Sequence, residues 1–266
     1  MNPLLTHFGL QRPAFGRSTP KDALLRHKGF EEARKRLRFT VELESIALLL
    51  SEPGCGKSLL LGEVADELRR GEGFCVHYFA HATVGPFGLV NVFARKAGLA
   101  PRRSRGETAL ALVEHLLADE ARHLLVLDEA HLLPDATLED VRLLTIADFD
   151  RKSPFVLLLA GQTALDDRLA EPVHHALDQR ITTVARLVPL SADETKQYLL
   201  LRLEAAGADR PVFDDGATDL LYDATGGVPR RVNNLATSAL IVAAARNRRL
   251  VSAQDVKDAQ MDRGRP

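Results

Sequence analysis

The sequence predicts an α/β protein with a parallel sheet and helices on both of its faces, followed by a small all-helical domain. Short apolar runs alternate with segments of helical periodicity, a pattern typical of successive strand–helix–strand units. After Pro189 the strand-like runs stop, and only helical patterns follow. The apolar runs are residues 46–50, 74–79, 124–127, 155–160 and 183–188, and the helical segments between them lie near 59–70, 87–97, 107–120 and 138–149.

Composition divides the chain into three parts. Residues 1–40 are rich in proline and basic residues, and we expect this N-terminal extension to pack on the core. Residues 41–190 carry the alternating pattern, and residues 191–266 form the helical domain. Ser191 and Glu194 have the spacing of a capping box, which predicts where the first helix of that domain begins. This first helix is expected to end near residue 206. Three further helices are expected near residues 215–225, 229–247 and 253–261.

The bulk properties exclude several classes of protein. The formal net charge is −1, so no overall field favours nucleic acid or an anionic membrane, and such binding needs a local patch. The two cysteines, Cys55 and Cys75, are typical of a reducing compartment rather than of a disulfide framework. The N-terminus lacks the pattern of a secretory signal, and the longest apolar run, residues 235–245, is too short to cross a bilayer. The sequence therefore predicts a cytoplasmic protein without a membrane partner.

A glycine-rich segment between the first apolar run and the next helix predicts a phosphate-binding loop. It reads SEPGCGKS (residues 51–58) and matches G-x-x-x-x-G-K-[ST], except that Ser51 stands in place of the first glycine. Glycines allow backbone N–H groups to point at phosphate, and the following helix adds positive potential. Lys57 is expected to contact the β- and γ-phosphates, and the Ser58 hydroxyl to ligate Mg²⁺. The predicted nucleotide-contacting set from this segment is Ser51, Glu52, Pro53, Gly54, Cys55, Gly56, Lys57, Ser58 and Leu59.

This interpretation has one alternative, and the effect of Ser51 depends on its backbone conformation. The segment is also compatible with a glycine–proline turn before a helix that carries a lysine and a serine by chance. Ser51 strains the loop only if its backbone has a positive φ, at about 1–3 kcal/mol.

The segment LLVLDEAHLL predicts the second half of the site. Asp128 and Glu129 directly follow four apolar residues, at the carboxyl end of a strand, where open α/β sheets bind ligands. Asp128 is expected to hold Mg²⁺ and Glu129 to orient the attacking water. His131 is expected to be a supporting or surface histidine, because no group of Cys and His has metal-ligand spacing in the sequence. Together the two segments predict binding of ATP and Mg²⁺, with ATP hydrolysis.

The order of motifs resembles the AAA+ ATPases, P-loop NTPases with a helical lid after the α/β domain. HFGLQRPAF (residues 7–15), AGQTAL, LDQRI and GVPRRVN follow the order of the ExeA-like branch, which includes secretion-pathway protein A and the TnsC/TniB-like transposition helpers. This resemblance implies that Gln162 senses the γ-phosphate, and that Arg180 is an arginine finger acting on a neighbouring subunit. It also implies that Arg230 contacts nucleotide from the helical lid, with Arg231 as the alternative.

The roles of Gln162 and Arg180 each have an alternative, and so does the expectation of ATP turnover. The alternative for Gln162 is a residue that caps a loop. The alternative for Arg180 is a residue in a surface salt bridge. Ile146 and Ala147 occupy positions where the branch often has a polar residue such as Asn. Together with Ser51, Ala147 leaves open a nucleotide-gated scaffold with little turnover.

A local basic segment predicts contact with DNA phosphates through Arg95, Lys96, Arg102, Arg103 and Arg105, and the alternative is a solvated loop. With the resemblance, it predicts a homo-oligomer, a ring or a filament, with ATP at its subunit interfaces. This assembly is expected to bind duplex DNA and to recruit a transposase. A secretion or cell-envelope ATPase is the alternative, and it is disfavoured because the sequence shows neither a membrane segment nor a cell-wall-binding domain.

Overall fold

The computed structural model describes residues 2–16, 23–71, 73–80, 85–148, 151–262 and 264, with only the backbone described for residues 85–87. The chain forms two compact units. One unit is Gly29–Leu187, and the other combines Met1–Lys28 with Val188–Pro266. We call them the α/β unit and the helical unit, and describe each by itself.

The α/β unit is built on a parallel sheet of five strands in the order β2-β3-β4-β1-β5. This confirms the predicted sheet, and the strand boundaries lie within two residues of those expected. The central strand β1 is buried along its whole length, which explains why it reads as an unbroken apolar run. The strands are β1 (Ile46–Ser51), β2 (Cys75–Phe79), β3 (His123–Leu127), β4 (Val156–Gly161) and β5 (Ile181–Leu187).

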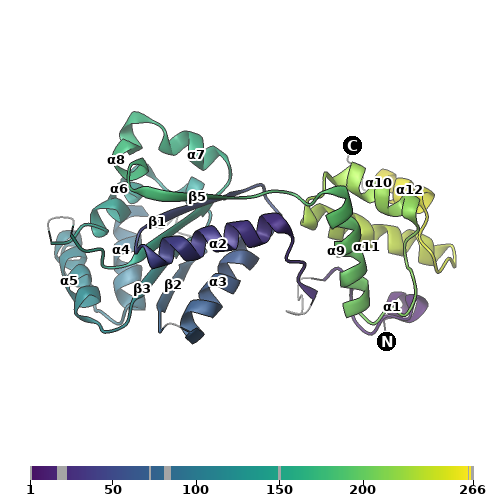
Figure 1. The fold of residues 1–266 in the computed structure, drawn as a ribbon, viewed down its shortest axis with the longest axis horizontal. Coiled ribbons are helices and arrows are strands. Elements are labelled where there is room, and N and C mark those ends of the chain that lie inside the picture. Colours follow the sequence, from purple (N-terminus) through teal and green to yellow (C-terminus); the bar gives the residue numbers. More distant parts are fainter. Residues whose placement is uncertain are drawn as a thin grey trace. The chain divides into compact units, whose positions relative to one another are not determined.

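Helices cover both faces of the sheet, as predicted. Alternate residues of the strands, such as Leu48, Leu125 and Leu157, join one apolar cluster with the helices α4, α5 and α6. Figure 1 shows α2 and α3 running beside each other, and Arg34 of α2 lies 3.2 Å from Glu67 of α3. The helices are α2 (Lys28–Glu42), α3 (Lys57–Gly71), α4 (Gly85–Lys96), α5 (Arg105–Ala118), α6 (Asp135–Leu144), α7 (Ala164–Leu169) and α8 (His175–Asp178), with short 3₁₀ turns η2 (Ala130–Leu132) and η3 (Pro172–His174).

The helical unit has its own apolar core. The predicted capping box is present at the start of α9, where Ser191 and Glu194 each accept a hydrogen bond from the other's backbone N–H. Val232, Ala236 and Ala239 of α11 are fully buried in this core. The helices are α1 (Pro3–Phe8), α9 (Ala192–Ala205), α10 (Asp215–Thr225), α11 (Pro229–Ala245) and α12 (Ala253–Asp262).

The first 40 residues do not form one extension on the α/β core, which corrects our expectation. Phe8 and Leu10 are buried in the core of the helical unit. The buried guanidinium of Arg202 donates hydrogen bonds to the carbonyls of Ala14 and Gly16, at 2.7 and 3.1 Å. Only the segment from Gly29 onward belongs to the α/β unit. The apolar residues of HFGLQRPAF thus serve the helical unit, a pairing of distant segments that local composition does not reveal.

No helix in the described ranges combines the length and the apolar character that crossing a bilayer requires.

Candidate functional site

The predicted phosphate loop connects β1 to α3. Gly54 and Gly56 have φ values of 97° and 100°, which residues with a side chain rarely adopt. The turn is closed by a hydrogen bond from the Cys55 N–H to the Glu52 carbonyl at 3.3 Å. Helix α3 then begins at Lys57, so its first N–H groups lack intrahelical acceptors and face the loop end. This is the local structure that binds phosphate at a helix N-terminus.

Ser51 does not strain this loop. It is the last residue of β1, pairs in register with Leu187 of β5, and is not among the residues with positive φ. The side chain is buried, and its hydroxyl has no hydrogen-bond partner within the described ranges. The first position of the motif is therefore ordinary strand backbone here, and glycine is not required.

Lys57, Asp128 and Glu129 form one charged network at the carboxyl ends of β1 and β3. The Lys57 ammonium lies 3.0 Å from Glu129 Oε1 and 3.4 Å from Asp128 Oδ1. Lys57 and Asp128 are both buried. The two carboxylates thus share a cation, which removes the repulsion expected between adjacent acids. The structure brings together the two segments that the sequence placed 71 residues apart.

Asp128 also receives two hydroxyl groups. Ser58 Oγ and the Tyr78 phenol each donate to Asp128 Oδ2 at 2.9 Å. Burial, followed by the hydrogen bond to Asp128, raises the pKa of Tyr78 to about 12, so the phenol stays a donor at neutral pH. Sequence reasoning missed Tyr78, because the pairing of β2 with β3 that places it there cannot be read from the sequence.

Glu129 has an unusual backbone. Its φ and ψ are 54° and 36°, in the left-handed region that is uncommon for residues with a side chain. The Glu129 N–H donates to Asp128 Oδ1 at 2.9 Å, and its carboxylate lies 3.5 Å from His131 Nδ1. Such backbone conformations persist where the surroundings impose them, often at functional sites. His131 supports Glu129, in line with the supporting role expected for it.

Gln162 follows directly after β4, the strand that lies between β1 and β3. Its backbone N–H points at His131 Nδ1 at the long distance of 3.5 Å. The half-buried Gln162 is thus placed between the phosphate loop and the Asp128–Glu129 pair. Among the described residues its side chain has no hydrogen-bond partner, so the γ-phosphate role stays a prediction.

The donor set at this edge fits Mg²⁺. The Ser58 hydroxyl and the Asp128 carboxylate are hard oxygen ligands that already converge, and Mg²⁺ prefers such ligands together with substrate phosphates. Ser58 and Asp128 would hold the ion. Bound there, Mg²⁺ would neutralise charge on the β- and γ-phosphates.

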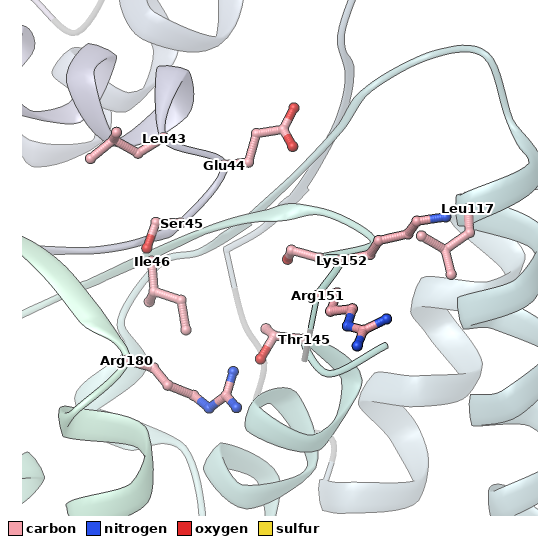
Figure 2. Close-up of a pocket in the computed structure, with 10 residues that line it drawn as sticks. Leu43, Glu44, Ser45, Ile46, Leu117, Thr145, Arg151, Lys152 and Arg180 are labelled. Atoms are coloured by element: carbon pink, nitrogen blue, oxygen red, sulfur yellow. The ribbon is translucent and has the colours of Figure 1, made fainter. Parts of the chain in front are cut away.

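Arg180 lies at the opposite side of the same sheet, where the strands have their amino ends. It precedes β5 and lines a pocket of about 580 Å³ together with Ile46, the first residue of β1. Figure 2 shows Arg180, Thr145 and Arg151 around the same space. Lys152 adds another cation to this pocket, and Glu44 an anion. We call it the amino-edge pocket.

The remaining predicted residues are spread over both units. Arg230 and Arg231 are exposed in the first turn of α11 in the helical unit. In the basic segment, Lys96 donates to the Tyr78 carbonyl at 2.7 Å, and Arg105 forms an ion pair with the buried Asp140. These two cations have structural partners, which weakens their assignment to DNA. Arg95, Arg102 and Arg103 are exposed.

The fold and this site define a P-loop ATPase of the AAA+ class. A parallel sheet carries the glycine loop, its lysine and serine after β1, and an acidic pair after β3. The predicted class of enzyme is confirmed, and the individual roles of Gln162, Arg180 and Arg230 stay predictions.

Comparison with known proteins agrees with this class. Residues 41–169 match the family model described as AAA domain. The chain is 32% identical over 250 residues to general secretion pathway protein A of Aeromonas hydrophila, and the match covers 90% of this chain and 44% of that protein. The chain therefore spans less than half the length of this curated relative.

Solved structures share the fold over nearly the whole chain. Cdc6p from Pyrobaculum aerophilum matches with a TM-score of 0.73 and 20% identity, over 94% of this chain and 70% of that one. The structure of Drosophila ORC bound to DNA matches with a TM-score of 0.73 and 17% identity, over 100% of this chain and 67% of that one.

Proposed function

We propose that the protein is an ATPase that works as a homo-oligomer, with each ATP held between two subunits. The observation that carries this proposal is the placement of charge on opposite edges of one sheet. Lys57, Asp128 and Glu129 lie at the carboxyl edge, and Arg180 lines the amino-edge pocket. The six residues of β1 separate these edges by roughly 17–20 Å at about 3.3 Å per residue. One α/β unit cannot bring Arg180 to its own phosphate loop.

Each residue then has a defined task. Lys57 and the loop backbone bind the β- and γ-phosphates, and Glu129 orients the attacking water and accepts its proton. Gln162, beside both, holds the γ-phosphate or this water in place. Arg180 of the neighbouring subunit offsets the charge that develops on the transferred phosphoryl group. Arg230 binds nucleotide from the helical unit; the order of motifs in the sequence supports this assignment.

Mixing two inactive variants tests the shared site. Lys57→Ala removes the phosphate ligand, and Arg180→Ala removes the finger, so each variant alone should lose most ATPase activity. In a 1:1 mixture, about a quarter of the interfaces join an intact Lys57 to an intact Arg180 from different subunits. We expect ATPase activity to return to roughly that fraction. A mixture as inactive as its components would refute action in trans, and Arg70→Ala, an exposed arginine at the end of α3, is the matched control.

We further propose that the oligomer binds duplex DNA and recruits a transposase. The exposed Arg95, Arg102 and Arg103, which end α4 or precede α5, support contact with phosphates. A solved structure of the same fold is that of ORC bound to DNA. Replacing Arg102 and Arg103 by Gln should lower the slope of log K against log salt by about 2. The adjacent pair Arg69 and Arg70, replaced in the same way, should leave the slope unchanged; equal slopes for both variants would remove Arg102 and Arg103 from the DNA interface.

A secretion or cell-envelope assembly ATPase is the second candidate. The observation that favours it is the 32% identity to general secretion pathway protein A over 90% of this chain. Duplex DNA discriminates between the two. Stimulation of ATPase activity and ATP-dependent filaments or rings on DNA favour the first candidate, and activity that is indifferent to DNA favours the second. Recruitment is tested by ATP-dependent co-sedimentation of a transposase encoded in a neighbouring gene with the DNA-bound oligomer.

A further inference from the structure

Three side chains of different chemistry converge at the amino ends of β2 and β3. Cys75, the first residue of β2, pairs in register with His123, the first residue of β3. Asp119 caps the C-terminus of α5, four residues before His123. One ligand atom from each of these residues lies within 4.8 Å of the other two. This cluster is at the edge of the sheet opposite the phosphate loop, so the ATPase site does not account for it.

The distance between two of the ligand atoms matches shared coordination. Asp119 Oδ2 lies 3.3 Å from His123 Nε2. Oxygen and nitrogen ligands at about 2.0–2.2 Å from a tetrahedral zinc ion are themselves roughly 3.3–3.5 Å apart. Asp119 Oδ1 accepts a hydrogen bond from the Ala121 N–H at 3.1 Å. That bond fixes the carboxylate and leaves Oδ2 facing the imidazole.

His123 presents a nitrogen that the protein leaves unsatisfied. The side chain is buried, and within the described ranges Nε2 makes no hydrogen bond, although Asp119 Oδ2 lies 3.3 Å away. The other nitrogen, Nδ1, lies 3.2 Å from Nε2 of the buried His77. When Nδ1 carries the proton and donates it to His77, the Nε2 lone pair faces a carboxylate. That arrangement is repulsive unless a cation lies between them.

The surroundings hold the ring of His123 against that of His77. The rings stack with centroids 5.4 Å apart, which holds the imidazole of His123 in place. A histidine ligand ordinarily donates its second N–H to a neighbouring acceptor, which orients the ring and selects the coordinating nitrogen. His77 Nε2 can serve as this acceptor when His77 carries its own proton on Nδ1.

We propose that Cys75, Asp119 and His123 bind a zinc ion, with water as the fourth ligand. A thiolate, an imidazole and a carboxylate form a ligand set typical of zinc, and a thiolate selects against Mg²⁺ and Ca²⁺. Cys75 is exposed, so the fourth position is open to solvent. Because its ligands come from two strands and a helix end, this ion would act as a structural cross-link. It ties the edge strand β2 to β3 and to the end of α5.

The sequence did not indicate this site because its ligands lie on separate elements. Residues 75 and 119 are separated by a strand and two helices, and no short Cys–His motif results. Only the register of β2 against β3 places Cys75 beside His123.

Cobalt(II) titration of the metal-free chain tests the proposal. Cobalt replaces zinc in tetrahedral sites, and a bound thiolate adds a charge-transfer band in the near ultraviolet. We expect one cobalt ion per chain with this band, displaced by one equivalent of zinc. Cys75→Ser should abolish the band without unfolding, since its side chain is exposed. Asp119→Asn should weaken binding more than tenfold, in line with the loss of one of three protein ligands. Zinc should also raise the melting temperature of the parent by several degrees, and that of Cys75→Ser much less.

Matched variants separate this site from other sources of the same signal. Cys55→Ser removes the thiol of the phosphate loop and should keep the band. Glu120→Gln neutralises the acid next to Asp119 and should leave affinity within about twofold. A band that persists in Cys75→Ser, or a parent chain that fails to bind zinc at micromolar concentration, would overturn the proposal. None of these measurements depends on ATPase activity.

Discussion

The ammonium group of Lys57 lies where two partners compete for it. The carboxylate of Glu129 holds it at 3.0 Å, yet the phosphate of ATP requires the same group. Glu129→Gln removes this competitor and also the carboxylate that we propose to activate water. We therefore expect ATP affinity to rise several-fold while turnover falls by about 100-fold or more. Equilibrium binding and single-turnover hydrolysis measure the two effects, and Glu139→Gln on α6 is the control. Affinity that falls in Glu129→Gln would contradict the competition.

Tyr78 positions Asp128 through a hydrogen bond. Its phenol and the Ser58 hydroxyl donate to the same carboxylate oxygen. Tyr78→Phe keeps the ring and removes only the donor. The Mg²⁺ concentration for half-maximal ATPase activity should then rise several-fold, because Asp128 is held less firmly. The KM for ATP at saturating Mg²⁺ should stay within about twofold, since the phosphate contacts are unchanged. Tyr222→Phe in α10 is the control, and an unchanged Mg²⁺ requirement would remove Tyr78 from the site.

The buried His27 makes the helical unit sensitive to acid. Burial lowers its pKa, more than the nearby Glu194 carboxylate at 3.7 Å raises it. The unfolded chain therefore takes up the proton first. The stabilising contribution is fully present above the unfolded pKa of 6.5 and is lost as the pH falls toward the lower folded value. Stability should fall by at most about 1.4 kcal/mol per pH unit for one histidine. Urea unfolding from pH 7.5 to 5 should show a shallower loss in His27→Gln, and an equal slope would contradict this.

At the scale of elements, the α/β pattern was predictable because burial dictates it. β1 is buried on both faces, so its sequence is a continuous apolar run that local reasoning recognises. The phosphate loop and the Asp128–Glu129 pair were predictable for a related reason. Their chemistry requires particular residue types directly after a strand, and that adjacency is visible in the sequence.

Contacts between elements that are distant in the chain were not predictable. Tyr78 reaches Asp128 only because β2 pairs with β3, and strand order is not written in any local pattern. Phe8 enters the core of the helical unit instead of the α/β core, although its own segment is compatible with either. The short helices α7 and α8 were also missed, since six and four residues are too few to show a period.

The turn between α10 and α11 depends on one glycine. Gly227 has a φ of 70°, and a Cβ there would lie 1.9 Å from the Leu190 carbonyl oxygen. Leu190 also donates its N–H to the Gly227 carbonyl at 3.0 Å, so the two backbones cannot separate freely. Gly227→Ala should destabilise the helical unit by several kcal/mol. Gly226→Ala has open space at a φ of 58° and should cost about 1 kcal/mol. Chemical denaturation measures both, and equal losses would contradict the steric account.

At the scale of the whole molecule, the proposed function distributes the parts of one ATP site over two subunits and over both units of the chain. The phosphate loop and the acidic pair lie at one edge of the sheet, and Arg180 lies at the other. The helical unit adds two exposed arginines at the start of α11. In the proposed function, an oligomer accounts for the position of Arg180, and a lid that contacts nucleotide accounts for the two arginines of α11. Arg180→Ala tests the oligomer and Arg230→Ala tests the lid, so either explanation can fail while the other holds.

The two arginines at the start of α11 differ in the direction from which they can meet a ligand. Successive residues of a helix point about 100° apart, so Arg230 and Arg231 address different directions. The resemblance of the GVPRRVN motif to the family pattern favours Arg230. Arg230→Ala should therefore raise the KM for ATP about tenfold, while Arg231→Ala should change it less than about twofold.

Both side chains are exposed, so neither variant should alter the unfolding midpoint in denaturant, and a loss of activity then reports on nucleotide contact rather than folding. Hydrogen exchange adds a readout that is independent of turnover. In the parent chain, ATP should slow exchange in the first turn of α11, and Arg230→Ala should abolish that protection. If Arg231→Ala has the larger effect, the nucleotide contact belongs to Arg231; if neither changes KM or protection, α11 does not touch the nucleotide.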